Sequence, residues 1–334
     1  MRALVVRRVL NAIVVTMVAI TITFFLAHAA PGDPIGSSLD DPHVSEATRT
    51  FWRHRYGLDR PIPMQYLSYL SASLRGDFGY SLTYNEPVSE VVARALPNTC
   101  LLAGTALLAS FVIGILIALA QVARSGSLLD RGLGAILLAL YSMPDFWLAQ
   151  LALLLFAYWL PILPAGGVVD PVLHPYMGVG DALLDRLRHM VLPVATLTAL
   201  STAAVARFQR AALLDVSAED YLRTARAKGL PERSVILHHA LRNALLPVIT
   251  LFGLSLPGFL AGTTFVEKVF SWPGIGALAV DSVAARDYPV IIACTVIASI
   301  AVTVGSLIAD LLYFLADPRL RYPALQSINE PEAG

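Results

Sequence analysis

The chain has 334 residues, of which 56% are hydrophobic and only 14% are charged. Soluble domains carry about 25% charged residues, so this composition argues against a soluble enzyme. Lys and Arg together number 24, as do Asp and Glu, and this balance gives no support to a nucleic-acid partner.

Six apolar stretches are long enough to cross a bilayer, which takes about 17–25 mostly apolar residues. Because a backbone in hydrocarbon must satisfy its own hydrogen bonds, each stretch is expected to be helical. The sequence therefore predicts an all-α polytopic membrane protein with six transmembrane helices. The six stretches are residues 9–27, 100–123, 132–160, 190–206, 244–266 and 290–316.

The first stretch has features of a secretory signal, because Arg7 and Arg8 precede it and Ala27-His28-Ala29 follows it. A signal core has about 7–15 apolar residues, and this stretch is longer. We interpret it as an uncleaved helix, so residues 1–30 are expected to form the cytoplasmic N-terminus and transmembrane helix 1.

Residues 31–97 are predicted to form a helical segment outside the membrane. Ser45 is suited to begin a helix that runs to about Tyr56, and Pro63 a second one that ends near Gly76. Pro87 precedes a third, in which valines recur at helical spacing. This extracytoplasmic segment is either a scaffold that braces the bundle or a docking surface, and the sequence leaves both interpretations open.

Residues 98–316 are expected to form a five-helix core, followed by a cytoplasmic tail at 317–334. Asp145 falls inside the third apolar stretch, where a charge costs about 2.5–3.5 kcal/mol to insert. It is therefore expected either to line the translocation path with Ser142 and Ser255 or to form a structural hydrogen bond at the Pro144 kink.

The distribution of positive charge predicts the orientation of the chain. With the N-terminus inside, inner segments carry 14 of the 24 Lys and Arg residues, and six of the others lie in the long first outer segment, which is largely exempt from the rule. Both termini are therefore predicted to be cytoplasmic.

The inner loop at 207–243 carries half of that inner positive charge and is the most informative stretch. Ser217 is expected to cap a short helix that Gly229 ends, and Pro231 is suited to begin the next helix. Tyr221 and Leu222 are predicted to be buried anchors, and Ala225, Ala227 and Gly229 to permit close approach of another backbone. The helix is interpreted as docking in a groove of a soluble partner, with an interfacial helix on lipid headgroups as the alternative.

The chain has no nucleotide site of the Walker type. Its only lysines are Lys228 and Lys268, and neither follows a glycine, as the phosphate-binding lysine of that motif must. Any ATP hydrolysis is therefore expected to belong to another polypeptide.

The run from Asp220 to Leu230 resembles the coupling loop of bacterial ABC-importer permeases, in particular the dipeptide/oligopeptide (peptide/nickel) permease family. The resemblance extends over nearly the whole chain. Its other motifs are Pro31-Gly32-Asp33-Pro34, Gly57-Leu58-Asp59-Arg60-Pro61, Gly76-Asp77-Phe78-Gly79-Tyr80-Ser81-Leu82, Leu96-Pro97-Asn98-Thr99, Asp130-Arg131, Ser142-Met143-Pro144, His239 to Pro247, Glu267-Lys268-Val269-Phe270-Ser271-Trp272-Pro273-Gly274-Ile275-Gly276, Arg286-Asp287-Tyr288-Pro289 and Asp317-Pro318-Arg319.

The resemblance implies a type I ABC-importer permease fold in a prokaryotic plasma (inner) membrane, and an import subunit rather than an enzyme. It also implies a second related permease, two ATPase subunits that hold ATP and Mg²⁺, and an extracytoplasmic solute-binding protein. This chain itself is expected to need no cofactor or metal. Peptides are the expected cargo; the alternative is a polytopic membrane enzyme or a transporter without ATP coupling. The residues expected to couple to the ATPases are Glu219, Asp220, Tyr221, Leu222, Arg223, Thr224, Ala225, Arg226, Ala227, Lys228 and Gly229.

Overall fold

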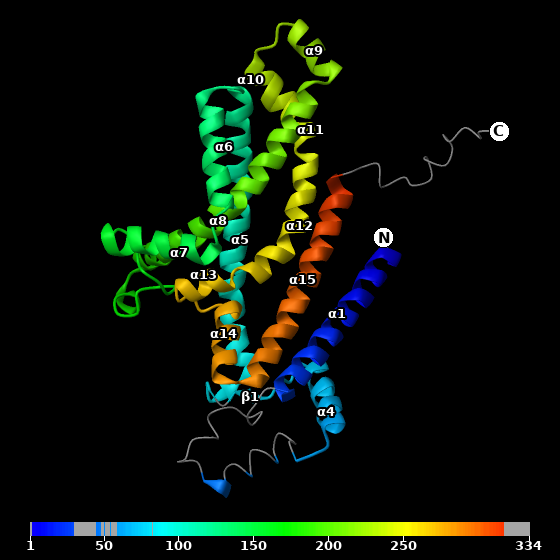
Figure 1. The fold of residues 1–334 in the computed structure, drawn as a ribbon, viewed down its shortest axis with the longest axis vertical. Helices are drawn as coiled ribbons and strands as arrows, with labels where there is room; N and C mark the ends of the chain where they lie inside the picture. Colours follow the sequence, from blue (N-terminus) through cyan, green and yellow to red (C-terminus); the bar gives the residue numbers. More distant parts are fainter. Residues whose placement is uncertain are drawn as a thin grey trace, which may run out of the picture. The chain divides into compact units, whose positions relative to one another are not determined.

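The computed structural model describes residues 2–29, 59–81 and 83–316, together with residues 45–47, 50 and 54. Helices dominate this part of the chain, and a single two-stranded hairpin accompanies them (Figure 1). The sequence thus predicted the all-α class correctly, and the uniformly apolar composition of the long helices is the reason.

The helices before the hairpin are α1 (Arg2–Ala29) and α4 (Ile62–Leu74), and the hairpin pairs β1 (Tyr80–Ser81) with β2 (Glu86–Pro87). The elements that follow are α5 (Val88–Ala123), α6 (Leu128–Tyr141), α7 (Asp145–Leu153), the π-helix η1 (Leu154–Trp159), the 3₁₀-helix η2 (His174–Tyr176), α8 (Val179–Ser217), α9 (Asp220–Ala227), α10 (Glu232–Ser234), the π-helix η3 (Val235–Ala240), α11 (Leu241–Ala244), α12 (Leu246–Gly262), α13 (Thr264–Val269), α14 (Ile275–Ala285) and α15 (Tyr288–Ala316).

Three of the described helices are long and apolar enough to cross a membrane, namely α5, α8 and the part of α15 up to Leu312. Two helix pairs, each interrupted by a short break, raise the number to five if each pair counts as one span. They are α6 with α7 and η1, and residues 232–244 with 246–256. The first predicted stretch lies in α1, whose apolar part Ile13–Leu26 is shorter. The number six therefore stays a prediction.

The outer segment contains two of its three predicted helices. The helix expected from Pro63 is α4, and the helix expected after Pro87 begins at Val88. That third helix does not end before the second apolar stretch but continues as the 36 residues of α5, so residue 97 lies inside a helix. More than half of the helix expected from Ser45 to Tyr56 lies outside the described residues.

The chain divides into two compact units. Unit 1 comprises Met1–Gly104, Asp145–Val194 and Leu260–Thr303. In its core, the buried face of α5 (Val88, Val91 and Val92) packs against α14 and the start of α15. This apolar face was expected from the helical spacing of the valines.

In the same unit, α1 packs on α4. The Phe24 ring of α1 stacks on Tyr69 and meets Tyr66 edge to face, and Thr21 shares a 2.7 Å hydrogen bond with the Tyr66 hydroxyl. Aromatic pairs of this kind contribute about 0.5–1.5 kcal/mol beyond the area they bury. Helix α4 is therefore attached to α1 in the described structure.

Unit 2 comprises Thr105–Pro144, Ala195–Phe259 and Val304–Gly334. The C-terminal half of α5 packs in it against α8, α12 and the inner loop, with Leu107, Phe111, Val205 and Val248 forming one buried cluster. Figure 1 shows the inner loop, with α9 and α10, at the end of this unit where α5 passes into α6. This end of unit 2 carries the predicted coupling residues.

Candidate functional site

The helix predicted in the inner loop is present as α9, between Asp220 and Ala227. It ends in a Schellman arrangement, in which Gly229 N–H donates to the Arg226 carbonyl (2.9 Å) and Leu230 N–H to the Ala225 carbonyl (3.4 Å). Gly229 adopts φ +77°, a left-handed conformation that other residues adopt at a cost. The predicted stop is therefore confirmed, and so is the start of α10 directly after Pro231.

The predicted N-cap was wrong. Ser217 is still in α8, and its hydroxyl donates to the Leu213 carbonyl at 2.6 Å. Glu219 occupies the N-cap position of α9 and makes no capping hydrogen bond through its side chain. A serine in the last turn of a helix can bond backward to the carbonyl four residues earlier, and this competes with forward capping.

The inner face of α9 is packed against unit 2 itself. Leu222 is fully buried and Ala225 is 8% exposed, and residues three apart lie on one face of a helix. They contact a cluster that includes Ala118 of α5, Leu213 of α8 and Val235 of η3. Leu222 is buried, as an anchor was expected to be, but both it and Ala225 pack within this chain and not in the groove of a partner.

Polar contacts add to this packing. The Arg226 guanidinium donates to both carboxylate oxygens of Glu232 in α10, at 3.1 and 2.9 Å, and to the Ser217 carbonyl at 3.3 Å. These bonds with the Glu232 carboxylate raise the pKa of Arg226. Asn243 of α11 donates to the Tyr221 hydroxyl at 2.8 Å, and Tyr221 is 42% exposed rather than buried as predicted.

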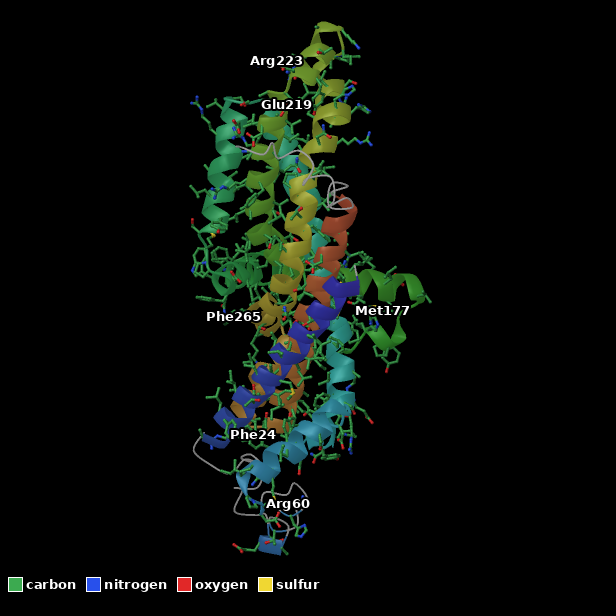
Figure 2. The ribbon with its side chains drawn as sticks, turned by 90° about the vertical axis from the view of Figure 1, so that its right-hand side faces the viewer. Phe24, Arg60, Met177, Glu219, Arg223 and Phe265 are labelled. Atoms are coloured by element: carbon green, nitrogen blue, oxygen red, sulfur yellow. The ribbon has the colours of Figure 1, made fainter. Side chains whose placement is uncertain are left out.

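The outer face of α9 consists of Asp220, Arg223, Thr224 and Ala227, and all four are exposed. Arg223 donates to the Asp220 carboxylate at 3.1 Å, a pair that lies wholly within α9. Figure 2 labels Arg223 and Glu219 on this part of the loop. The face thus carries one ion pair, one hydroxyl and one small side chain. Because Thr224 and Ala227 are small, another backbone can approach this surface closely. Lys228 is exposed beside it, just past the end of the helix.

The three residues predicted for the translocation path are not brought together within one unit. Ser142 and Ser255 belong to unit 2, and both hydroxyls donate to the carbonyl four residues earlier, Leu138 at 2.9 Å and Leu251 at 2.8 Å. Asp145 begins α7 in unit 1 and is exposed. Within the described structure its carboxylate has no hydrogen-bond partner, so the structural bond considered at the Pro144 kink is not formed there.

A buried carboxylate in unit 1 had no role in the interpretation of the sequence. Glu267 of α13 is fully buried, and its Oε1 accepts from the hydroxyls of Thr99 (2.7 Å) and Thr263 (2.8 Å). Its Oε2 accepts from the Ala277 N–H at 3.0 Å. These bonds join α5, α13 and α14 around one acidic group, which is how a buried charge is tolerated.

Gly274 leaves the space that the Glu267 carboxylate occupies. A Cβ at Gly274 would lie 2.4–2.5 Å from the Glu267 carboxylate atoms, closer than real contacts allow. We call the contact of α5, α13 and α14 around Glu267 the Glu267 junction. Two further hydrogen bonds stabilise it: the Trp272 indole donates to the Asn98 carbonyl (3.0 Å), and the Asn98 amide donates to the Pro273 carbonyl (2.9 Å). The available signal was a glutamate directly after the fifth apolar stretch, with a glycine seven residues later.

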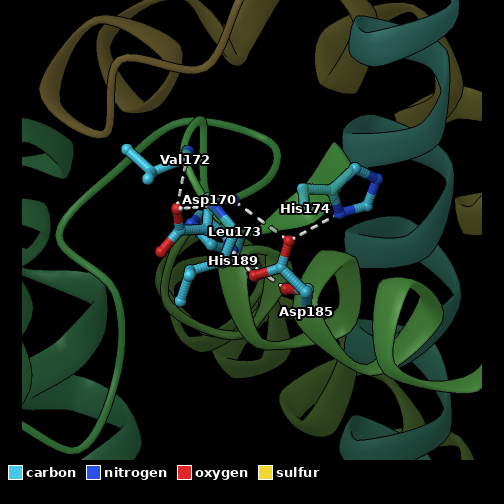
Figure 3. Close-up of polar contacts among 6 residues, drawn as sticks. All are labelled: Asp170, Val172, Leu173, His174, Asp185 and His189. Atoms are coloured by element: carbon cyan, nitrogen blue, oxygen red, sulfur yellow. Dashed lines mark hydrogen bonds and ion pairs between the residues drawn. The ribbon is translucent and has the colours of Figure 1, made fainter. Parts of the chain in front are cut away.

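Unit 1 also contains a polar cluster between the loop after η1 and the start of α8 (Figure 3). The Asp185 carboxylate accepts from the Asp170 N–H (3.0 Å) and pairs with His174 Nδ1 (2.8 Å). His189 Nδ1 donates to the Asp185 backbone carbonyl (2.9 Å) and lies 3.2 Å from its carboxylate. These contacts join the loop to the start of α8. Among the described residues no group of His, Cys, Asp or Glu is arranged to hold a metal ion.

The stability of the loop around Asp170 is expected to depend on pH. Backbone N–H groups of Leu173 and Val172 donate to Asp170 Oδ1 at 2.9 and 2.8 Å, and they lower the pKa of Asp170. Because the pKa is lower in the folded loop than in an unfolded one, the stabilisation is complete above the unfolded value of about 3.9 and is lost as the pH falls through the folded value.

Hydrogen exchange at the amides of residues 172 and 173, corrected for intrinsic rates, is therefore expected to show constant protection between about pH 5 and 7 and a loss only below about pH 4. In Asp170→Asn this acid-dependent step should be absent. A step at the same pH in the Asn variant would assign the effect to another group.

Two family models match the chain. The model described as "Binding-protein-dependent transport system inner membrane component" matches residues 110–322, and its N-terminal counterpart, "Binding-prot-dependent transport system membrane comp, N-term", matches residues 1–103. Together they leave little of the chain unmatched, and the first alone covers more than half of it.

Proteins of known role are similar over nearly their whole length. The oligopeptide transport system permease protein AppB of Bacillus subtilis (strain 168) is 40% identical, with 96% of this chain and 100% of that protein covered. The di/tripeptide transport system permease protein DppB of Pseudomonas aeruginosa (strain UCBPP-PA14) is 38% identical, over 94% of this chain and 98% of that one. The dipeptide transport system permease protein DppB of Escherichia coli (strain K12) is 33% identical at the same coverage.

Solved structures resemble the chain more distantly. A structure described as the MetNI methionine ABC transporter in inward-facing conformations aligns with a TM-score of 0.49 and 17% identity, over 67% of this chain and 96% of that one. A structure described as an amino acid ABC transporter with histidines aligns with a TM-score of 0.48, also at 17% identity, over 67% of this chain and 94% of that one.

Two kinds of observation point to the same class of protein. They are the apolar helices of the structure and the sequence matches over nearly the whole chain. They identify a multi-pass inner-membrane transport component rather than a polytopic enzyme or a transporter of another kind. The chain belongs to the family of binding-protein-dependent transport system inner membrane components.

Proposed function

We propose that the chain is the permease subunit of an ATP-driven importer of di- or oligopeptides and forms half of the translocation path together with a second, related permease. The named relatives that are 33–40% identical over more than nine-tenths of this chain are peptide permeases, which supports a peptide cargo. ATP and Mg²⁺ are bound by two separate ATPase subunits, and a solute-binding protein delivers the peptide from the outer side.

One observation carries the coupling part of the proposal. Helix α9 buries Leu222 and Ala225 in its own unit and leaves Asp220, Arg223 and Thr224 exposed. An isolated helix of eight residues is too short to be stable in water by itself, so its packing on unit 2 supports a rigid, outward-facing contact. We propose that this outer face docks on the ATPase subunits and passes their movement to the permease.

The orientation and the path follow from the same proposal. Helix α9 is cytoplasmic, both termini are on that side, and six helices cross the membrane. Asp145, Ser142 and Ser255 line the path. The Asp145 carboxylate is exposed and has no ion-pair partner among the described residues, which supports this role, because such a charge in a membrane protein faces a water-filled cavity or a partner.

Reconstitution of the complete transporter in vesicles tests the proposal. With the second permease, the ATPases and the binding protein present, a labelled dipeptide is expected to accumulate only when ATP is enclosed on the α9 side. An excess of unlabelled peptide is expected to compete, whereas free amino acids are not. Accumulation of peptide without ATP, or ATP-driven uptake that peptides do not compete with, would overturn it.

A further inference from the structure

One side chain of the inner loop contacts three successive elements. Arg226 belongs to α9, its Nε and Nη2 donate to the two carboxylate oxygens of Glu232 in α10, and its Nη1 donates to the carbonyl of Ser217 at the end of α8. The two residues that it joins are 15 positions apart in the sequence, and α9 lies between them.

The contacts of Arg226 fix the orientation of α9 as well as its distance from α8 and α10. A guanidinium that bonds both oxygens of a carboxylate holds the two planes in register, which a lysine ammonium cannot do. The third bond reaches one of the final carbonyls of α8, where the helix has no backbone donor left and a cation is favourable. Arg226 therefore ties the orientation of α9 to the end of α8 and the start of α10.

The clamp made by Arg226, Glu232 and Ser217 contributes little to stability. The side chains of Arg226 and Glu232 are 37% and 56% exposed, and exposed ion pairs contribute about 0–1 kcal/mol. Leu222 and Ala225 already supply the apolar packing that holds α9 in place. Apolar contacts of one leucine and one alanine are not directional, so they resist detachment of the helix better than its rotation.

We propose that Arg226 is a positioning residue that keeps α9 at a fixed angle to α8 and α10. A displacement of α9 then moves unit 2 as a whole and does not merely rotate α9 within the inner loop. This inference rests on the proposed function, because it assumes that α9 receives the movement of an ATPase. Loss of the clamp leaves the subunits assembled but lowers the amount of peptide moved for each ATP hydrolysed.

The variants that test this are Arg226→Gln and Glu232→Gln, each of which removes one side of the pair. The exchange Arg226→Glu with Glu232→Arg restores an ion pair of opposite direction. The matched control is Arg233→Gln, which removes one positive charge from an exposed arginine of α10 that has no ion-pair partner in the described part of the chain.

In the reconstituted transporter, we expect both single variants to retain the ATPases at wild-type stoichiometry and to lower the ratio of peptide transported to ATP hydrolysed by about fivefold. The exchange should recover at least half of the ratio, and Arg233→Gln should leave it unchanged. A wild-type ratio in Arg226→Gln, or an equal loss in Arg233→Gln, would overturn the inference. Loss of the ATPases from the complex would also overturn it, because Arg226 would then be a contact residue.

A second measurement does not depend on transport. A nitroxide label at position 224 of the full-length permease, without ATPases, is expected to gain mobility in Arg226→Gln but not in Arg233→Gln. Equal mobility in both variants refutes the clamp whatever the cargo. If the label responds as expected but the wild-type transporter moves no peptide, the failure belongs to the proposed function and not to the clamp.

Discussion

Ala227→Trp is expected to lower ATP-driven uptake sharply while the permease itself stays folded. Ala227 is exposed in the last turn of α9, on its outer face, so the added ring is expected to leave the packing of unit 2 intact. A bulky side chain in a closely packed interface costs about 2 kcal/mol or more, so uptake should fall by about thirtyfold or more. The checks are peptide uptake, recovery of the ATPases with the purified permease, and the midpoint of thermal unfolding.

Two further variants separate contact from folding. Ala225→Trp places the same ring on the buried face of α9, so it should lower the unfolding midpoint, which Ala227→Trp should not. Ala284→Trp, at an exposed alanine of α14, should retain the ATPases. Wild-type uptake in Ala227→Trp would remove the outer face of α9 from the mechanism.

Gly274→Ala is expected to destabilise unit 1, although it adds a single methyl group. The new Cβ would overlap the carboxylate of Glu267, which is fully buried and held by three hydrogen bonds. Overpacking of a close-packed site costs about 1–3 kcal/mol, so the unfolding midpoint in detergent should fall by several degrees. Gly104→Ala is the matched control, because an added Cβ there has no neighbour within 4 Å in the described structure.

The same site makes a prediction about non-additivity. Glu267→Ala leaves the hydroxyls of Thr99 and Thr263 and the Ala277 N–H without their buried acceptor, at about 1–3 kcal/mol for each unsatisfied group. It also clears the space that the Gly274→Ala methyl needs. The double variant should therefore be less destabilised than the sum of the two single variants, since residues in contact do not act independently. Strict additivity would show that the methyl and the carboxylate do not compete for space.

The sequence predicted the elements whose signals are local. Helix α9 was predicted from Gly229 at its end and Pro231 after it, whereas its N-cap was placed wrongly at Ser217. The direction in which its residues face was harder to predict, because Ala225 and Ala227 have identical side chains. Only the packing of Leu222 and Leu213 decides which of the two is buried.

The Glu267 junction could not be predicted for a different reason. Its bonding partners lie 168 residues earlier in the chain for Thr99 and 10 residues later for Ala277, and no periodicity relates them. The contact between Arg226 and Glu232 could not be predicted for a similar reason, although the two residues are close in sequence. They become neighbours only when the chain turns at Gly229 and Pro231. Apolar runs and capping residues predict helices, whereas contacts between helices depend on packing.

Site-specific crosslinking from α9 tests the central claim most directly. A benzophenone side chain at position 224, on the outer face of α9, should form a crosslink to an ATPase subunit when the transporting complex is illuminated. The same group at position 283, which is exposed on α14, should not. If position 224 reacts only with lipid or detergent while the complex transports peptide in an ATP-dependent manner, α9 is not the coupling element.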